Sequence, residues 1–205
     1  MQTLSAQELT EQIRRARGGC MNALGDLLEL YRSYLGLIAR VQFQDTFQAK
    51  FSQSDVIQAT FLQANKAFVH FAGNTEGELM AWLRKIFASQ LATEIRRYST
   101  RRRDATLERQ IHLQVDQSSV MLAGMLVGRG GSPSQSAIRR EHAVLLADAL
   151  AKLPEDYREV IVLRHLRGTG FGEIADKMNR SIDSVKGIWR RAIRKLRELL
   201  GDRID

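Results

Sequence analysis

Cysteine and proline are both scarce in this chain of 205 residues, and each scarcity excludes a class of structure. Cys20 is the only cysteine, so neither a disulfide within the chain nor a cysteine-rich zinc site can form. A lone cysteine is typical of a reducing compartment, and we expect a cytoplasmic protein. The only prolines are Pro133 and Pro154, which favours a mostly helical chain with few proline turns.

Long apolar runs are missing, and aromatic residues are few. No stretch approaches the roughly 18 consecutive apolar residues that span a membrane, so we expect no membrane insertion. The first residues, MQTLSAQELTEQIRRA, contain no apolar core of a signal peptide. Aromatic residues make up 7% of the chain, and no β-branched run alternates with polar residues, which disfavours strands. The composition therefore predicts an all-α protein.

The sequence also lacks a catalytic or metal-binding pattern. Its histidines are scattered, with no closely spaced pair: His70, His112, His142 and His165. The glycine-rich run 128–131 follows no predicted strand and lacks the lysine of a phosphate-binding loop. We therefore expect neither an enzyme nor a site for a cofactor or metal.

What the chain does have is positive charge in two separate regions. The formal net charge is +8, and the sequence pI is about 10.1. Segment 84–109 has eight Lys and Arg residues against three acids, and segment 139–205 has fifteen against eleven. Such regions favour an anionic partner, and nucleic acid is the commonest one.

Capping signals and apolar periodicity predict the helices of the N-terminal part. Ser5 with Glu8 and Thr75 with Glu78 have the spacing of capping boxes, which mark helix starts. Apolar residues at helical spacing follow each start. The predicted helices run from Ser5 to about Arg17, across Leu24 to Ile38, from Ser54 to about Gly73, and from Thr75 to about Tyr98.

A segment rich in Ser, Gly and Gln separates the two parts of the chain. We predict two small helical domains, 1–104 and 137–205, joined by a flexible linker, 105–136. Apolar residues within 121–127 are unusual for a solvated linker and leave two alternatives open. They could dock onto a partner, or they could belong to a short helix packed on its own domain.

The C-terminal domain has the pattern of a helix-turn-helix. Pro154 and the acids after it mark a helix start, a short helix is predicted at 173–178, and Ser181 can cap a last helix to about Leu200. That last helix is apolar on one face and basic elsewhere, as in helices that enter the major groove. The side chains predicted to meet bases or phosphates are Asp183, Ser184, Lys186, Gly187, Arg190, Arg191, Arg194 and Lys195.

Two separate segments resemble the extracytoplasmic-function (ECF) sigma factors of bacteria. Leu153-Pro-Glu-Asp-Tyr, together with Glu173-Ile-Ala and Arg190-Arg-Ala-Ile-Arg-Lys-Leu, is similar to region 4 of that family. Ser54-Asp-Val-Ile-Gln-Ala-Thr-Phe, followed by Ala81-Trp-Leu, resembles region 2. Helix-turn-helix segments alone are widespread, but the two motifs in this order and at this separation are specific to the family.

The resemblance implies a transcription-initiation factor whose partners are core RNA polymerase and promoter DNA. Region 4 then recognises the minus-thirty-five element as duplex through the last helix. The polymerase-binding residues implied in region 2 are Asp55, Gln58, Thr60 and Phe61, with Phe61 itself in the core. The residues implied to hold the minus-ten element as a single strand are Arg84, Lys85, Ser89, Gln90, Arg96, Arg97, Arg101 and Arg102. Family members are often held by an anti-sigma protein, which is a further expected partner.

Four positions depart from the family pattern. Ala59 stands where a Glu is usual, Ser89 where an Asn is common, and Thr93 where an Asp is common. Gly187 is small where a longer side chain is frequent. These differences leave the preferred promoter bases open and do not affect the implied role.

Two other functions remain open from the sequence. A stand-alone helix-turn-helix regulator would explain 153–200 but would leave 54–103 without a role. A basic helical adaptor would bind DNA weakly, with strong salt sensitivity and no sequence preference.

Overall fold

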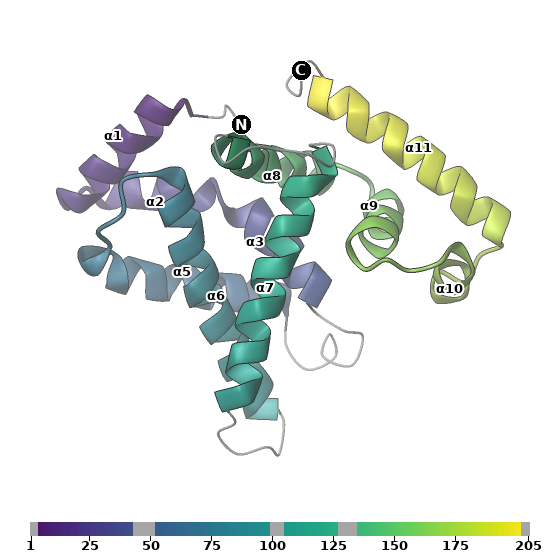
Figure 1. The fold of residues 1–205 in the computed structure, drawn as a ribbon, viewed down its shortest axis with the longest axis horizontal. Helices are drawn as coiled ribbons and strands as arrows, with labels where there is room; N and C mark the ends of the chain where they lie inside the picture. Colours follow the sequence, from purple (N-terminus) through teal and green to yellow (C-terminus); the bar gives the residue numbers. More distant parts are fainter. Residues whose placement is uncertain (1–3, 43–51, 99–104, 127–134, 202–205) are drawn as a thin grey trace. The chain divides into compact units, whose positions relative to one another are not determined.

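The computed structural model describes residues 4–42, 52–98, 105–126 and 135–201, and this described part contains helices and turns but no strand (Figure 1). The prediction of an all-α protein is confirmed. The chain divides into two compact units, Met1–Ser119 (unit 1) and Val120–Asp205 (unit 2). We describe each unit by itself.

Unit 1 is built on helices whose starts are set by side-chain caps. Both predicted capping boxes form, with Ser5 and Glu8 at one start and Thr75 and Glu78 at another. The helices are α1 (Ala6–Arg17), α2 (Met21–Glu29), α3 (Arg32–Gln42), α5 (Gln53–Ala67), α6 (Glu76–Tyr98) and most of α7 (Ala105–Leu126), with a 3-10 turn at Phe68–His70.

The single helix predicted across 24–38 is wrong, because the chain breaks between α2 and α3. The Tyr31 backbone N–H donates to the carbonyl of Leu28, three residues back, which tightens the chain and ends α2. The Tyr31 carbonyl then accepts from Leu35 in the first turn of α3. The side chain of Tyr31 is 1% exposed, so the break directs this large ring into the core.

Helix α6 is the centre of unit 1. It contacts α1 and α5, and apolar side chains along its length are fully buried. Burial of each such Leu or Phe contributes about 1.5–3 kcal/mol. Trp82 packs against Phe68 and Phe71 with ring centroids 5.8 and 5.0 Å away, which ties the connection after α5 to α6.

Residues 105–126 form helix α7, although the sequence suggested an irregular linker there. Ile111, Val115 and Ser118 are buried, and their three- and four-residue spacing places them on one face of the helix. Residues 105–119 are therefore packed within unit 1. The two alternatives for 121–127 stay open. Residues 127–134 lie outside the described part of the chain.

Unit 2 contains the predicted helix-turn-helix. Its helices are α8 (Gln135–Ala151), α9 (Glu155–Ile161), α10 (Phe171–Lys177) and α11 (Ile182–Leu200), and a π-helical turn, Val162–Leu166, extends α9. The turn between α10 and α11 contains Asn179 at φ 49°, a left-handed conformation that Asn tolerates better than most residues. The Ser181 hydroxyl accepts from the Ser184 backbone N–H and so begins α11, as predicted.

A hydrogen bond outside the core joins the π-helical turn to α11. The Trp189 indole Nε1–H donates to His165 Nε2 over 2.9 Å, and the two rings stack. Phe171 of α10 packs edge-on against Trp189, and Arg164 lies over the Phe171 ring. This cluster fixes α11 against the rest of the helix-turn-helix.

Replacement of Ser181 by alanine should destabilise unit 2. The Ser181→Ala variant loses the acceptor for a backbone N–H of the first turn, which costs about 1 kcal/mol. Urea unfolding followed by circular dichroism measures this loss. Ser54→Ala, which alters an exposed serine within α5, is the control and should leave the unfolding midpoint nearly unchanged. An equal effect of both substitutions would contradict the capping role.

The stability of unit 2 should depend on pH through His165. Partial burial of the ring, and then the charge of Arg164, lower the pKa of His165. The unfolded state, with a His pKa of about 6.5, then binds the proton more readily, so the free energy of unfolding falls as pH drops from about 7 through the folded-state pKa.

The His165→Gln variant keeps an acceptor oxygen but does not titrate, so we expect it to flatten this pH dependence. Urea unfolding between about pH 5 and 8 provides the test. His70→Gln alters an exposed histidine of unit 1 and should keep the wild-type slope. If His165→Gln also kept that slope, titration of His165 would not be the source of the pH dependence.

Candidate nucleic-acid interface

Helix α11 buries one face and presents its predicted DNA-binding residues on the others. Val185, Ile188 and Ala192 are buried in unit 2. None of the predicted DNA-binding residues lies on this buried face. The exposed ones are Asp183, Arg190, Arg191, Arg194 and Lys195. The half-exposed ones are Ser184, Lys186 and Gly187.

The two ion pairs on the exposed surface of α11 are weak and partly exposed to solvent. Lys186 lies 3.9 Å from Asp183, and Lys195 lies 3.0 Å from Glu198, both within α11 and both exposed enough to exchange partners. A Cβ at Gly187 would lie 3.5 Å from a guanidinium nitrogen of Arg191. This is an ordinary van der Waals distance, so a methyl group at position 187 would fit beside Arg191.

The basic side of α6 is arranged differently, because α7 covers part of it. The Arg84 side chain is only 17% exposed, and its Nε lies 2.9 Å from Asp116 of α7. Ser89 Oγ lies 3.5 Å from His112 Nε2, and Arg96 lies 3.6 Å from Glu108. Three residues predicted to hold the minus-ten strand therefore contact α7.

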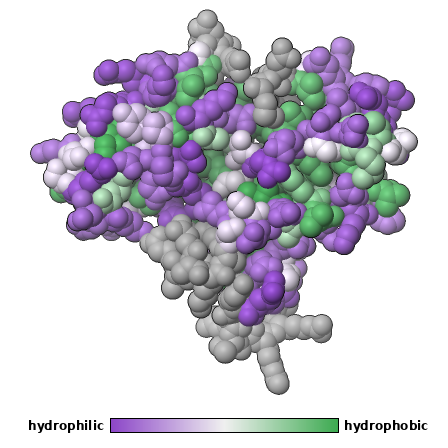
Figure 2. Space-filling view, turned by 180° about the vertical axis from the view of Figure 1, so that it is seen from behind, coloured by the Kyte–Doolittle hydropathy of each residue, from purple (hydrophilic) through white to green (hydrophobic). Residues whose placement is uncertain are grey.

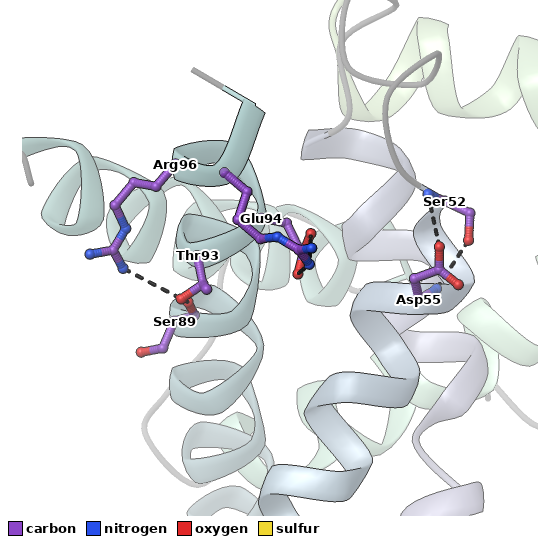
Figure 3. A network of polar contacts seen from close by, with 7 residues as sticks. Ser52, Asp55, Ser89, Thr93, Glu94 and Arg96 are labelled. Carbon is purple, nitrogen blue, oxygen red and sulfur yellow. Dashed lines mark hydrogen bonds and ion pairs between the residues drawn. The ribbon is translucent and has the colours of Figure 1, made fainter. Parts of the chain in front are cut away.

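The remaining predicted residues of this group are more accessible. Lys85 and Arg97 are exposed, and Gln90 is half-buried. Arg97 pairs within α6 with Glu94 over 3.3 Å. Figure 3 shows Arg96 reaching Thr93 on the outside of α6, close to the end of the helix. The other two predicted residues, Arg101 and Arg102, lie outside the described residues.

Electrostatic effects reinforce the link between α6, α7 and α3. Burial opposes the charge of Arg84, but the Tyr34 hydroxyl and Asp116 outweigh this effect and raise the pKa of Arg84. The Tyr34 hydroxyl accepts from Arg84 over 3.3 Å and donates to Ser119 over 2.7 Å. Burial raises the pKa of Tyr34, so this phenol stays neutral.

Helix α5 carries the predicted polymerase contacts, and one of them is wrong. Thr60 is fully buried, and its hydroxyl donates to the Val56 carbonyl over 2.7 Å. The buried face of α5 includes Val56 and Thr60, four residues apart, so Thr60 belongs to the core. Phe61, expected in the core, is half-buried beneath the guanidinium of Arg32.

The other predicted polymerase contacts of α5 are exposed. Asp55 closes the capping box with Ser52 at the helix start (Figure 3). Gln58 lies about one turn further along α5. Sequence reasoning missed Leu62, which is 59% exposed and four residues after Gln58. It also missed Val69, which is 80% exposed. Both are apolar residues off the buried stripe, a signal that could have identified them.

Hydrophilic residues cover much of the surface, with hydrophobic side chains showing between them (Figure 2). Among the described residues, no group of three or more His, Cys, Asp and Glu side chains could hold a metal ion. Within 4–42, 52–98, 105–126 and 135–201, no helix is long and apolar enough to cross a bilayer.

Comparison with known proteins points to one family. The family model "Sigma-70, region 4" matches residues 149–198, which include the helix-turn-helix. The ECF RNA polymerase sigma factor SigW of Bacillus subtilis is 22% identical over 194 residues, covering 95% of this chain and 97% of SigW. The ECF RNA polymerase sigma-E factor of Haemophilus influenzae is 24% identical over 203 residues, covering 98% of both chains.

A similar solved structure is that of CnrH in complex with the cytosolic domain of CnrY, with 25% sequence identity and a TM-score of 0.35. The match covers 93% of this chain and 96% of the solved chain. The region 4 match, together with relatives that align over almost the whole chain, agrees with the order of motifs in the sequence. The chain is therefore similar to the ECF sigma factors over almost its whole length.

Proposed function

We propose that this chain binds core RNA polymerase and directs it to promoters, where it recognises duplex DNA through α11 and melted DNA through α6. The observation that carries the proposal is α11 itself. Its apolar face is buried in unit 2, and its basic residues are exposed within the segment that matches region 4. The chain acts with polymerase, which we place in the cytoplasm.

The first turns of α11 suit readout of the minus-thirty-five element. An exposed helix N-terminus enters the major groove, where polar side chains meet base edges. Lys186 and Arg190 lie in this part of the helix. Further along, Arg191, Arg194 and Lys195 suit phosphate contacts, which add affinity but little sequence information.

Unit 1 suits the other two tasks. Exposed Asp55 and Gln58 on α5 supply polar contacts for polymerase, and Leu62 adds an apolar contact beside them. Lys85 and Arg97 on α6 supply positive charge for a melted strand. The chemistry of RNA synthesis belongs to polymerase, and this chain supplies binding energy and specificity. An anti-sigma partner stays a prediction from the resemblance.

Run-off transcription tests the proposal. The purified chain is added to sigma-free bacterial core polymerase with fragmented genomic DNA of the source organism as template. We expect discrete new transcripts that depend on the chain, and their start sites define the promoter. A sequence-specific gel shift by the chain alone, without transcripts, would favour a stand-alone regulator. Weak binding without sequence preference would favour a basic adaptor.

The Arg190→Ala variant should weaken promoter binding without affecting polymerase association. A base-edge contact contributes about 1–3 kcal/mol, so we expect about tenfold or greater loss of affinity for the minus-thirty-five duplex. Fluorescence anisotropy measures DNA affinity, and co-elution measures polymerase binding. The control Arg15→Ala removes an exposed arginine of α1 and should change DNA affinity little. Equal loss of polymerase and DNA binding in Arg190→Ala would contradict this role for α11.

A further inference from the structure

Helix α7 contacts three of the α6 residues that the family resemblance assigns to melted promoter DNA. The contacts are distributed along both helices: Arg84 with Asp116, Ser89 with His112, and Arg96 with Glu108. Each of these pairs lies within unit 1, and α6 and α7 lie side by side (Figure 1). Arg84, Ser89 and Arg96 therefore already have partners on α7 before any DNA arrives.

The carboxylates of α7 interact with α6 as the phosphates of a nucleic-acid backbone would. Asp116 and Glu108 place carboxylates against two arginines, as the phosphates of a DNA strand would. The guanidinium of Arg84 cannot pair fully with Asp116 and with a phosphate at once. The acidic side chains of α7 and a DNA strand therefore compete for the same positive charges.

Most of the contact is polar and partly exposed, which suits release. The Asp116 side chain is 63% exposed and that of Glu108 is 40% exposed, so each ion pair is individually weak. Gln42 of α3 adds hydrogen bonds to the Gln114 carbonyl and to Ser118 Oγ, at 3.1 and 2.7 Å. In the part of α7 within unit 1, the buried apolar side chains are Ile111 and Val115. This apolar contact is small beside that of α6.

We propose that α7 is an intramolecular cover of the minus-ten surface, and that single-stranded promoter DNA binds α6 by displacing it. This inference rests on the proposed function. Because α7 is part of the same chain, its carboxylates act at high effective concentration, which lowers the affinity of the free protein for DNA. A ligand that binds only the uncovered state shifts the equilibrium toward it.

Removal of the competing charges should raise affinity for single-stranded DNA. The test variant is Glu108→Gln/Asp116→Asn in the full chain, and the control is Glu11→Gln/Asp26→Asn, which removes the same charge from α1 and α2. The probe is a fluorescently labelled, mixed-sequence single strand of about 12 nucleotides. We expect about fivefold tighter binding for the test variant and less than about twofold for the control. Equal affinities of the two variants would overturn the proposal.

Hydrogen exchange gives a second, independent readout on the unaltered chain. Backbone amides of residues 105–119 should exchange faster when the single strand is bound, because α7 has left α6. Unchanged or slower exchange there would overturn displacement. Failure of the proposed function would give a different result, because neither the wild type nor the variant would support run-off transcription with core polymerase. If the chain supports transcription but the test and control variants bind single-stranded DNA equally, only the proposal that α7 covers α6 is wrong.

Discussion

Burial of α6 is the constraint on which the arrangement of unit 1 depends. Leu79, Leu83, Phe87 and Leu91 lie along this helix at four-residue spacing, and each is at most 2% exposed. α5 packs against this helix, and the aromatic cluster around Trp82 fixes the connection between the two. A helix buried to this extent cannot rotate to suit a ligand. Core packing therefore fixes the orientation of the polar side of α6, and DNA and polymerase have to bind it in that orientation.

In unit 2, helix α11 is likewise held in a fixed orientation by burial of one face. The apolar face of α11 holds the helix in place, while the contact between His165 and Trp189 lies outside the core. Neutral hydrogen bonds contribute only about 0.5–1.5 kcal/mol, so this pair adds little to cohesion. Its value is directional, because it joins the π-helical turn to the middle of the helix that carries Arg190. Short π-helical turns of this kind are often found at functional sites in proteins.

The sequence predicts those features that depend on local chemistry. The capping boxes at Ser5 and Thr75 and the start of α11 at Ser181 follow from residue types at fixed spacing, and the structure contains them. The break at Tyr31 was not predicted, because it depends on a core that accepts a large ring at that point. The placement of Phe61 in the core, with Thr60 at the surface, was likewise wrong, because the Thr60 hydroxyl can be buried once it donates to the Val56 carbonyl.

Helix α7 shows why residue type alone does not assign a binding site. Arg84, Lys85 and Arg97 are equivalent as positive charges in the sequence, yet they differ in what holds them. Arg84 is largely buried and paired across to α7, Lys85 is exposed, and Arg97 pairs with Glu94 on its own helix. Lys85 and Arg97 can therefore meet a phosphate without movement of α7, whereas Arg84 has to exchange its carboxylate partner on α7 for another anion. A strand that first contacts the accessible charges would gain binding energy before α7 moves, and that energy could offset the cost of uncovering the rest.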